Sequence, residues 1–292
     1  MNGAAPRLAL GTAQFGLAYG VAGRASAVDP PEARRILERA AAGGLRFVDT
    51  APAYGDIEER LADLCAGLDL RIVSKLPALP AGTEPAEAAA WMLHSAERSR
   101  QRLGSALDGL LLHRAEDLLD PAGDAIWRAL AQFSAANGVR LGVSCYEPAV
   151  LALVLARYPL ALAQIPGNAL DQRLAGIPRA QIAGVELHLR SAFLQGLLLL
   201  PEDVAQTRLP AATQELRHWH RWLAAKHMVA LDAALALVKG LPRLGHCVVG
   251  VDSLSQLDAI IAVWDRVQPM QAPELASERL EVIDPRQWRV AS

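Results

Sequence analysis

A chain of 292 residues, 52% of them hydrophobic, is long enough to bury one large core. Its formal net charge of −2 and isoelectric point near 6.4 give no electrostatic reason to expect nucleic acid or an anionic membrane as a partner. Three widely spaced cysteines, Cys65, Cys145 and Cys247, fit neither a disulfide framework nor a metal-binding spacing. Because no apolar run has the length of a signal peptide or a membrane span, we expect a soluble cytoplasmic protein.

Short apolar runs alternate along the chain with longer segments rich in Ala, Leu, Glu and Arg. The predicted strands are Leu8–Leu10, Arg46–Asp49, Arg71–Lys75, Leu107–His113, Arg140–Ser144, Leu160–Ile165, Gly184–Arg190 and His246–Gly250. The first long helix should begin at Pro30 and end at Gly43, and Ser253 should cap the last one. The stretch 196–212, with Pro201 and Pro210, is predicted to be an irregular lid or binding loop.

Strand–helix alternation with almost continuously apolar strands predicts a parallel sheet that is covered on both faces. Eight such units in a chain of this length favour a closed (β/α)8 barrel over an open doubly wound sheet. The turn after the first strand, GTAQFG, also lacks the G-x-G-x-x-G spacing of the open nucleotide-binding sheet. No linker or repeat interrupts the pattern, so we expect one domain over residues 1–292, with a C-terminal tail.

Polar side chains follow four consecutive predicted strands. Asp49 comes after FV, Lys75 after IVS, His113 after LLL and Ser144 after GV. Taken singly, such a residue is more often a turn, a cap or a satisfied core group, and an Asp–Lys pair can be a purely structural ion pair. In a barrel of parallel strands, however, these residues would meet at one rim with Tyr54 among them. The joint pattern therefore predicts a site.

This set of residue types suits the donation of a proton to a carbonyl oxygen. A tyrosine of ordinary pKa, about 10, is a poor acid near neutrality, and a neighbouring ammonium group lowers that pKa because it stabilises the phenolate. Asp49 would keep Lys75 charged and oriented, and a neutral His113 could bind the substrate oxygen. Asp49 and Tyr54 are thus interpreted as parts of one proton-donating relay.

The segments that contain these residues resemble the aldo-keto reductase superfamily over nearly the whole chain. The matching segments are LGTAQFG, FVDTAPAYG, VSKLP, LLLHR, GVRLGVSCY, QIPGNALDQR, RSAFLQGLL and VVGVDSLSQLDAI. The resemblance implies NAD(P)H-dependent reduction of an aldehyde or ketone, or the reverse oxidation, with Tyr54 as general acid, Lys75 and Asp49 tuning it, and His113 orienting the carbonyl. The later segments are similar to bacterial members linked to sugar or polysaccharide metabolism, which implies a small carbonyl or sugar-like substrate.

The resemblance also implies where a nicotinamide cofactor binds. The matching positions are Gly11, Thr12, Ser144, Cys145, Gln164, Arg190, Ser191, Phe193, Gln195, Gly250, Val251, Asp252, Ser253 and Gln256. Cys145 replaces a usual Asn, and Arg190 replaces a tyrosine that often stacks on the nicotinamide. NADP-specific relatives place Lys or Arg after the last strand, but GVDSLSQ has neither, and Asp252 would repel a phosphate. We therefore expect NADP(H) to bind with weak discrimination against NAD(H).

Two other functions could use the same residues. A regulatory protein on this barrel would bind cofactor and turn over poorly, like the channel-associated relatives of the superfamily. A barrel lyase or aldolase would use Lys75 as a Schiff base, which borohydride would trap, but it would leave Tyr54, Asp49 and His113 with less to do.

A predicted helix near residue 220 is rich in histidine and tryptophan. His218, His220 and His227 do not have the spacing of a metal site, so we expect no bound metal. Trp219 and Trp222 should pack on the barrel, and the histidines should face solvent.

Overall fold

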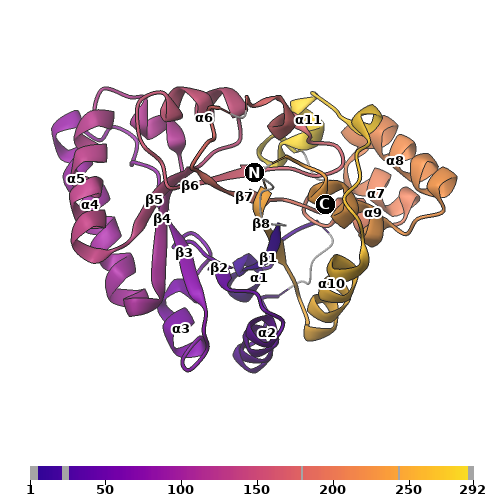
Figure 1. Cartoon of the computed structure of the whole chain (residues 1–292), viewed down its shortest axis with the longest axis horizontal. Coiled ribbons are helices and arrows are strands. Elements are labelled where there is room, and N and C mark those ends of the chain that lie inside the picture. The colour runs from indigo at the N-terminus through magenta and orange to yellow at the C-terminus, as the bar shows by residue number, and fades with distance from the viewer. Residues whose placement is uncertain (1–5, 22–25, 179, 243, 289–292) are drawn as a thin grey trace.

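A closed barrel of eight parallel strands forms the centre of the protein (Figure 1). The computed structural model describes residues 6–21, 26–178, 180–242 and 244–288. The strands are β1 (Arg7–Gly11), β2 (Phe47–Asp49), β3 (Arg71–Leu76), β4 (Leu107–Leu112), β5 (Arg140–Ser144), β6 (Leu162–Pro166), β7 (Glu186–Arg190) and β8 (Leu244–Gly250). Each strand pairs with the next, and β8 closes on β1. The predicted (β/α)8 barrel is confirmed, with strand ends that differ by at most two residues from the prediction.

Helices surround the barrel and begin at recognisable caps. They are α1 (Ala13–Gly16), α2 (Pro30–Ala42), α3 (Ile57–Leu64), α4 (Pro85–Leu103), α5 (Gly123–Asn137), α6 (Pro148–Leu155), α7 (Glu202–Arg208), α8 (Thr213–Lys226), α9 (Ala230–Lys239), α10 (Leu254–Arg266) and α11 (Leu280–Ile283). The side chain of Asp29 accepts a hydrogen bond from Glu32 N at the start of α2, and Ser253 does the same for Gln256 N at the start of α10. The helix starts predicted at Pro30 and Ser253 are therefore confirmed.

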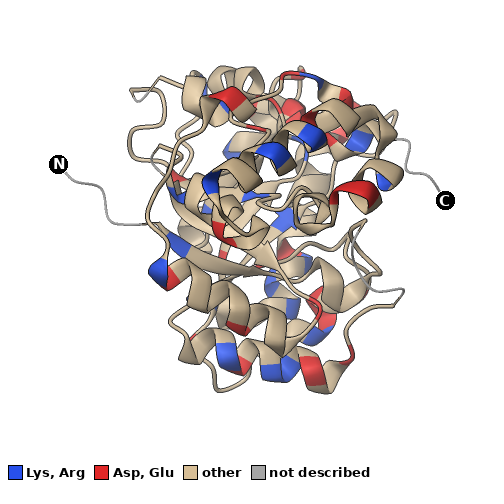
Figure 2. Cartoon of the chain, turned by 90° about the vertical axis from the view of Figure 1, so that its right-hand side faces the viewer, with Lys and Arg blue, Asp and Glu red and all other residues tan. Residues whose placement is uncertain are grey.

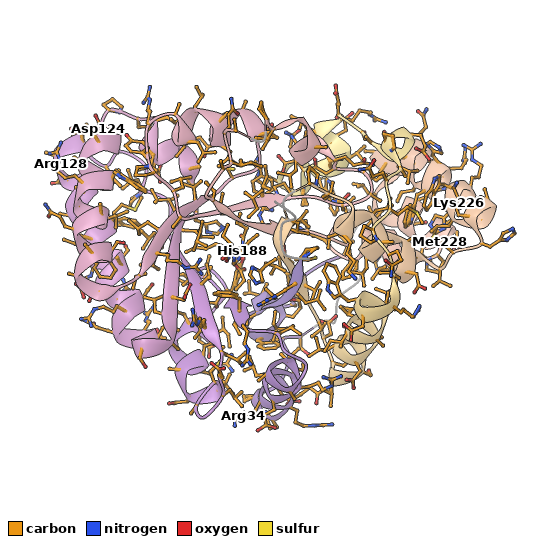
Figure 3. All side chains as sticks on the ribbon, in the orientation of Figure 1. Arg34, Asp124, Arg128, His188, Lys226 and Met228 are labelled. Carbon is orange, nitrogen blue, oxygen red and sulfur yellow. The ribbon has the colours of Figure 1, made fainter. Side chains whose placement is uncertain are left out.

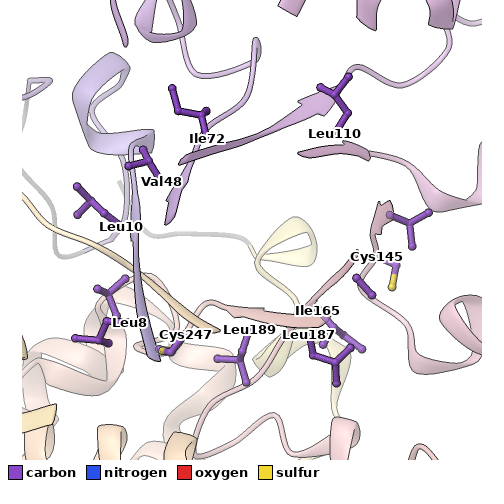
Figure 4. Packing of buried hydrophobic residues seen from close by; sticks show 14 of the residues in the cluster. Leu8, Leu10, Val48, Ile72, Leu110, Cys145, Ile165, Leu187, Leu189 and Cys247 are labelled. Carbon is purple, nitrogen blue, oxygen red and sulfur yellow. The ribbon is translucent and has the colours of Figure 1, made fainter. Parts of the chain in front are cut away.

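Successive strand residues face opposite sides of the barrel wall, which explains why the strands are apolar throughout. Leu8 and Leu10 belong to the large core between strands and helices, part of which Figure 4 shows. Ala9, between them, belongs instead to the layer inside the barrel, together with Leu162 and Val248. Because both faces are covered, the strands show no alternation with polar residues.

The segment 196–212 is helical and not irregular as its prolines suggested, although Gly196 and Leu199 at its start line the cavity described below. It contains α7 and the short 3-10 helices Leu197–Leu199 and Pro210–Ala212. Leu197 and Leu198 are fully buried, and the indole Nε1 of Trp219 donates to the Leu198 carbonyl at 3.0 Å. Trp219 therefore packs in a second apolar cluster, formed by α7, α8, part of α9 and the C-terminal segment beside the barrel (right in Figure 1), and not on the barrel itself. The prediction missed this cluster because each proline starts a helical turn here.

Basic and acidic residues intermix on the surface. In the view of Figure 2, basic and acidic residues are scattered among the helices. Some form ion pairs within or between helices, such as Arg34–Glu38 on α2 and Arg266–Asp232 between α10 and α9. Within the described ranges, no helix combines the length and the apolar character that crossing a bilayer requires.

A polar network closes the barrel at the amino ends of the strands. His188, near the centre of the barrel in Figure 3, places its Nε2 atom 2.8 Å from Glu186 Oε1, and His246 Nδ1 lies 3.4 Å from the same oxygen. Arg140 donates to the other oxygen of Glu186 at 3.2 Å, and the ring of Phe47 packs edge-on against both imidazoles. The hydrogen bond with His188 and the proximity of His246 hold the pKa of Glu186 well below its usual range, and burial lowers the pKa of His188. His188 is thus neutral near neutral pH.

The lowered pKa of His188 predicts a loss of stability in acid. Below the ordinary histidine pKa of about 6.5, the unfolded chain binds a proton that folded His188 resists, so the free energy of unfolding falls as the pH falls. His188→Gln keeps an amide donor for Glu186 but cannot titrate, and should lose less stability between about pH 7 and about pH 5. Urea unfolding at both pH values measures the difference. His218→Gln, on the exposed face of α8, is the matched control, and its free energy of unfolding should depend on pH as that of the wild-type protein does. If His188→Gln showed the same pH dependence as the wild-type protein, the role assigned to His188 would be contradicted.

Candidate active site

The carboxyl ends of the strands surround a cavity of about 580 Å³, a size within the range of about 300–1,000 Å³ that small-molecule and cofactor sites occupy. Most of the residues predicted from the sequence lie on its wall. These are Gly11, Thr12, Asp49, Tyr54, Lys75, His113, Ser144, Arg190, Ser191, Phe193, Gln195, Gly250, Asp252 and Gln256. The fold therefore gathers residues from six strand ends, and from the turns that follow them, around one cavity at the carboxyl end of the barrel.

Four of the predicted residues do not line this cavity. Cys145 and Val251 are buried in the core between strands and helices. Gln164 is fully buried, and its side chain points to Asp49. Ser253 caps α10 and bonds the hydroxyl of Ser255. The three buried residues, Cys145, Gln164 and Val251, can shape the cavity only through the groups that they hold in place.

A buried ion pair lies at the bottom of the cavity. Asp49 is in register with Val73, so Lys75, two residues further along β3, comes from the same face of the neighbouring strand. The Lys75 ammonium lies 2.7 Å from Asp49 Oδ1 and donates to the Thr50 carbonyl at 3.0 Å. Gln164, from β6, donates to Asp49 Oδ2 at 2.6 Å. Both carboxylate oxygens are therefore held, and the pair cannot rotate freely.

The surroundings of Lys75 keep its side chain charged although it is only 1% exposed. Burial by itself lowers the pKa of Lys75, but the charge and hydrogen bond of the Asp49 carboxylate, together with the nearby Tyr54 side chain, outweigh burial, and the pKa is raised above its usual value. The Nζ atom lies 5.1 Å from the centre of the Tyr54 ring. The arrangement thus places a permanent positive charge beside a phenol on the wall of the cavity.

His113 provides an uncharged imidazole on the same wall. Its backbone N–H donates to the Leu76 carbonyl at 3.0 Å, which fixes the start of the turn after β4. Partial desolvation of the ring within the cavity, together with the charges of Lys75 and Arg190, lowers the pKa of His113 to about 4. Near neutral pH the imidazole can therefore donate one hydrogen bond without carrying a charge.

Two glycines determine where Tyr54 lies. A Cβ atom on Gly16 would come within 1.7 Å of the Tyr54 carbonyl oxygen, so only a glycine lets the end of α1 approach this turn. Gly55, the next residue after Tyr54, has φ +70°, which an L side chain rarely adopts. The loop after β1 and the turn after β2 are thus packed backbone to backbone.

The segment after β7 holds a strained backbone against the cavity. Ser191, Leu194 and Gln195 have φ values of 63°, 49° and 54°, in the left-handed region that non-glycine residues seldom occupy. Such conformations cost of order 1–3 kcal/mol each and cluster at binding sites. Ser191 and Gln195 line the cavity, whereas Leu194 is fully buried in the second apolar cluster.

Several residues of the wall were not predicted from the sequence, notably Gln14, Tyr19, Tyr146, Leu231 and Arg286. Tyr19 and Tyr146 follow strands β1 and β5, so the strand-end rule could have found them. Leu231 and Arg286 come from α9 and from the C-terminal segment, and no local pattern indicates that these elements reach the mouth.

One group among the described residues could hold a metal ion, and the sequence had indicated none. The ligand atoms of Glu186, His188 and His246 all lie within 4.8 Å of one another. They close the amino end of the barrel, away from the cavity, and Arg140 already balances the charge of Glu186. We interpret the group as a hydrogen-bonded plug, because a divalent cation beside Arg140 would leave positive charge in excess.

A closed (β/α)8 barrel with a cofactor-sized cavity and a buried Lys–Asp pair at its carboxyl rim is the layout of a barrel enzyme. The model of the aldo/keto reductase family matches residues 7–276, and the chain belongs to this family. It is therefore an oxidoreductase of the aldo-keto reductase kind. No curated protein sequence matches the chain.

Solved structures with the same fold include two bacterial proteins. Aldo-keto reductase AKR11C1 from Bacillus halodurans, in its holo form, is similar with a TM-score of 0.73 and 21% identity, over 97% of this chain and 95% of that chain. A putative aldo-keto reductase from Pseudomonas aeruginosa gives a TM-score of 0.63 and 23% identity, over 89% of this chain and 90% of that chain. At these identities the likeness concerns the fold.

The contact between Gly16 and the Tyr54 turn predicts the effect of one methyl group. Gly16→Ala must push the turn away, and because a misplacement of about 1 Å can cost about 10²-fold in rate, kcat for carbonyl reduction should fall by about that factor. Gly176→Ala is the matched control, since nothing lies within 4 Å of its added Cβ. Steady-state kinetics on both variants, with circular dichroism to confirm folding, measure the effect. A folded Gly16→Ala protein with wild-type kcat would show that this contact does not position Tyr54.

Proposed function

We propose that this protein is an NAD(P)H-dependent oxidoreductase that reduces an aldehyde or ketone to an alcohol, or catalyses the reverse oxidation. The observation that carries the proposal is the placement of Tyr54 beside the buried Lys75–Asp49 pair, with neutral His113 on the same wall. These four groups come from separate strands and turns, and a purely structural ion pair would not need a phenol and an imidazole next to it.

In this proposal Tyr54 gives its phenolic proton to the carbonyl oxygen as that oxygen gains negative charge. Lys75 stabilises the resulting phenolate, and Asp49 and Gln164 hold the lysine and its counter-charge in place. His113 donates a hydrogen bond to the same oxygen and orients the carbonyl. A bound nicotinamide cofactor supplies the hydride.

The state of Lys75 supports this role over that of an imine-forming lysine. A nucleophilic amine needs a lowered pKa, so that it is neutral when it attacks. The charge and hydrogen bond of Asp49, together with the nearby Tyr54 side chain, instead outweigh burial and raise the pKa of Lys75. The lyase or aldolase alternative is therefore not proposed.

Substitution of the phenol tests the proton donor. Tyr54→Phe should keep cofactor affinity while kcat for carbonyl reduction falls by about 10²–10⁴, the usual worth of general acid catalysis. Lys75→Met should act in the same direction, and the losses should be far from additive in the double variant, because both residues serve one proton transfer. Stopped-flow reduction of a panel of aldehydes and ketones, with cofactor binding followed by fluorescence, measures both effects. Full activity of Tyr54→Phe would refute the mechanism.

The cavity fits a dinucleotide in several respects. Gly11 and Gly250 leave the strand ends of β1 and β8 without side chains where they line the wall. Arg190 presents its guanidinium to the cavity, and among the described residues its Nε atom is buried without a hydrogen-bond partner. Residues at the N-terminal end of α10, including Asp252 and Gln256, line the far end. In the proposal, the nicotinamide lies toward Arg190 and the adenosine toward α10.

The N-terminus of α10 is already occupied by an acid. Glu32, from α2, accepts a hydrogen bond from Leu254 N at 2.8 Å. The arginines of α2 near this point are themselves paired, Arg35 with Glu32 and Arg39 with Asp258. A 2′-phosphate would therefore meet a carboxylate and no unpaired arginine of α2, which supports the expectation of weak discrimination between NADP(H) and NAD(H).

Cofactor titrations test this expectation. We predict that NADPH and NADH bind within about 1–2 kcal/mol of each other, roughly one decade in Kd. Glu32→Gln removes the negative charge and should shift the ratio toward NADPH, while Glu38→Gln, an exposed acid of the same helix, should not. Fluorescence titration at fixed salt measures the ratios. A preference for NADPH of about three decades in the wild-type protein would reveal a cation that binds the phosphate.

A further inference from the structure

Two arginines stack on one aromatic ring at the wall of the cavity. The guanidinium carbon of Arg190 lies 3.8 Å from the centre of the Tyr146 ring, and that of Arg286 lies 3.6 Å from the same centre. All three residues line the cavity. Tyr146 follows β5, Arg190 ends β7, and Arg286 comes from the C-terminal segment, so three separate parts of the chain meet here. Two cations this close repel each other unless negative charge lies nearby.

The acids near this group fix the orientation of Arg286 and leave Arg190 unmatched. Asp284, which is fully buried, accepts from Nε and Nη2 of Arg286 at 3.0 Å and 2.6 Å. Glu147 Oε1 is 4.0 Å from Arg286 Nη2, while its other oxygen accepts from Arg173 at 2.9 Å. Arg190 donates only to Cys145 O and Ser191 Oγ, and no carboxylate of the described chain lies within 4.0 Å of it.

The donors of Arg286 leave room for a ligand. A guanidinium offers N–H groups on three nitrogens, and Asp284 occupies two of them, so Nη1 has no acceptor among the described residues. Its side chain is 49% exposed, and it belongs to the wall of the cavity. Because Asp284 fixes the plane of the guanidinium, Nη1 is held ready and loses little freedom when it binds an anion.

The position of this group separates it from the proposed adenosine end. Tyr146 follows β5, and Arg286 is close enough to Glu116, which follows β4, to feel its charge. In the closed barrel, β4 lies opposite β8, after which α10 begins. Tyr146 and Arg286 therefore border the mouth on the side away from the N-terminus of α10.

We propose that Arg286, supported by Tyr146 and by the charge of Arg190, forms an anion subsite that selects carbonyl substrates carrying a carboxylate or phosphate group. This inference rests on the proposed carbonyl reduction, since it names the class of substrate for that site. The anionic group would accept a hydrogen bond from Arg286 Nη1. The carbonyl of the same molecule would then lie deeper, toward Tyr54 and His113.

Matched pairs of substrates test the proposal. Succinic semialdehyde is compared with butanal, and glyceraldehyde 3-phosphate with glyceraldehyde, at saturating reduced cofactor. The wild-type protein should give a higher kcat/KM for the charged member of at least one pair, and the pair with the larger ratio identifies carboxylate or phosphate as the preferred group. Arg286→Met should lower that charged-to-neutral ratio by about 10-fold to 100-fold, the usual worth of a hydrogen bond to a charged group. Arg286→Lys keeps the charge but not the planar guanidinium, so its charged-to-neutral ratio should lie between those of the wild-type protein and Arg286→Met.

Two further variants separate recognition from folding. Tyr146→Leu removes the aromatic platform but leaves the Arg286–Asp284 pair intact, and should also lower the ratio. Arg279→Met is the matched control: this arginine lies in the same C-terminal segment, pairs with Glu215 and Glu281, and does not line the cavity. Arg279→Met removes the same charge and should leave kcat/KM unchanged for both the charged and the neutral substrate of each pair.

Succinate gives a readout that does not depend on turnover. It should raise the Tm of the wild-type protein and of Arg279→Met, but not that of Arg286→Met. If no aldehyde or ketone is reduced with either cofactor, the proposed function fails, and the succinate measurement still tests the subsite. Equal charged-to-neutral ratios in the wild-type protein and Arg286→Met would overturn the inference. So would a loss of NADPH affinity in Arg286→Met with an unchanged ratio, because the anion would then belong to the cofactor.

Discussion

The buried ion pair between Asp49 and Lys75 imposes the main constraint on the rim of the barrel. A buried pair of this kind is often no more stabilising than apolar residues of the same size, while an unpaired charge at the same place is very costly. The two groups must therefore stay together, and Gln164 must stay with Asp49 from the other side of the barrel. We infer that the apolar layers supply stability, whereas the pair determines where charge and proton donors lie.

The irregular features of the backbone lie around this constraint. Gly16 and Gly55 let the loops after β1 and β2 touch, which places Tyr54 over the lysine. On the opposite side, Ser191 and Gln195 accept left-handed φ values beside the cavity. The strands themselves keep ordinary parallel pairing, with register shifts only in β3–β4 and β7–β8. Three of the four non-glycine residues with left-handed φ in the described chain thus lie in the turn after β7 at the carboxyl rim, and the fourth, His227, ends α8.

The sequence predicts the barrel well because each strand is a short apolar run between helix signals, and parallel strands covered on both faces need no other pattern. It also predicts the strand-end residues Asp49, Lys75 and His113, since topology alone carries them to one rim. It does not predict that Gln164 binds Asp49 or that Arg286 stacks on Tyr146. Such contacts join segments that are far apart in the chain, so they produce no periodic pattern in the local sequence. The irregular structure expected for the segment 196–212 was wrong for a similar reason, since Leu197, Leu198 and Leu209 are buried in a cluster with α8.

The proposed selection of acidic substrates has to be local. A formal net charge of −2 and an intermixed surface cannot attract acidic molecules from a distance, so the protein as a whole gives no electrostatic steering toward them. Within the cavity, however, Lys75 and Arg190 bring positive charge close to Tyr54 and His113. Lys75 is paired with the carboxylate of Asp49, whereas Arg190 has no carboxylate partner among the described residues. Within a partly enclosed cavity such charges are screened less than on the surface. An acidic substrate would thus be distinguished after it arrives, by the fixed donors of Arg286 and not by the rate of encounter.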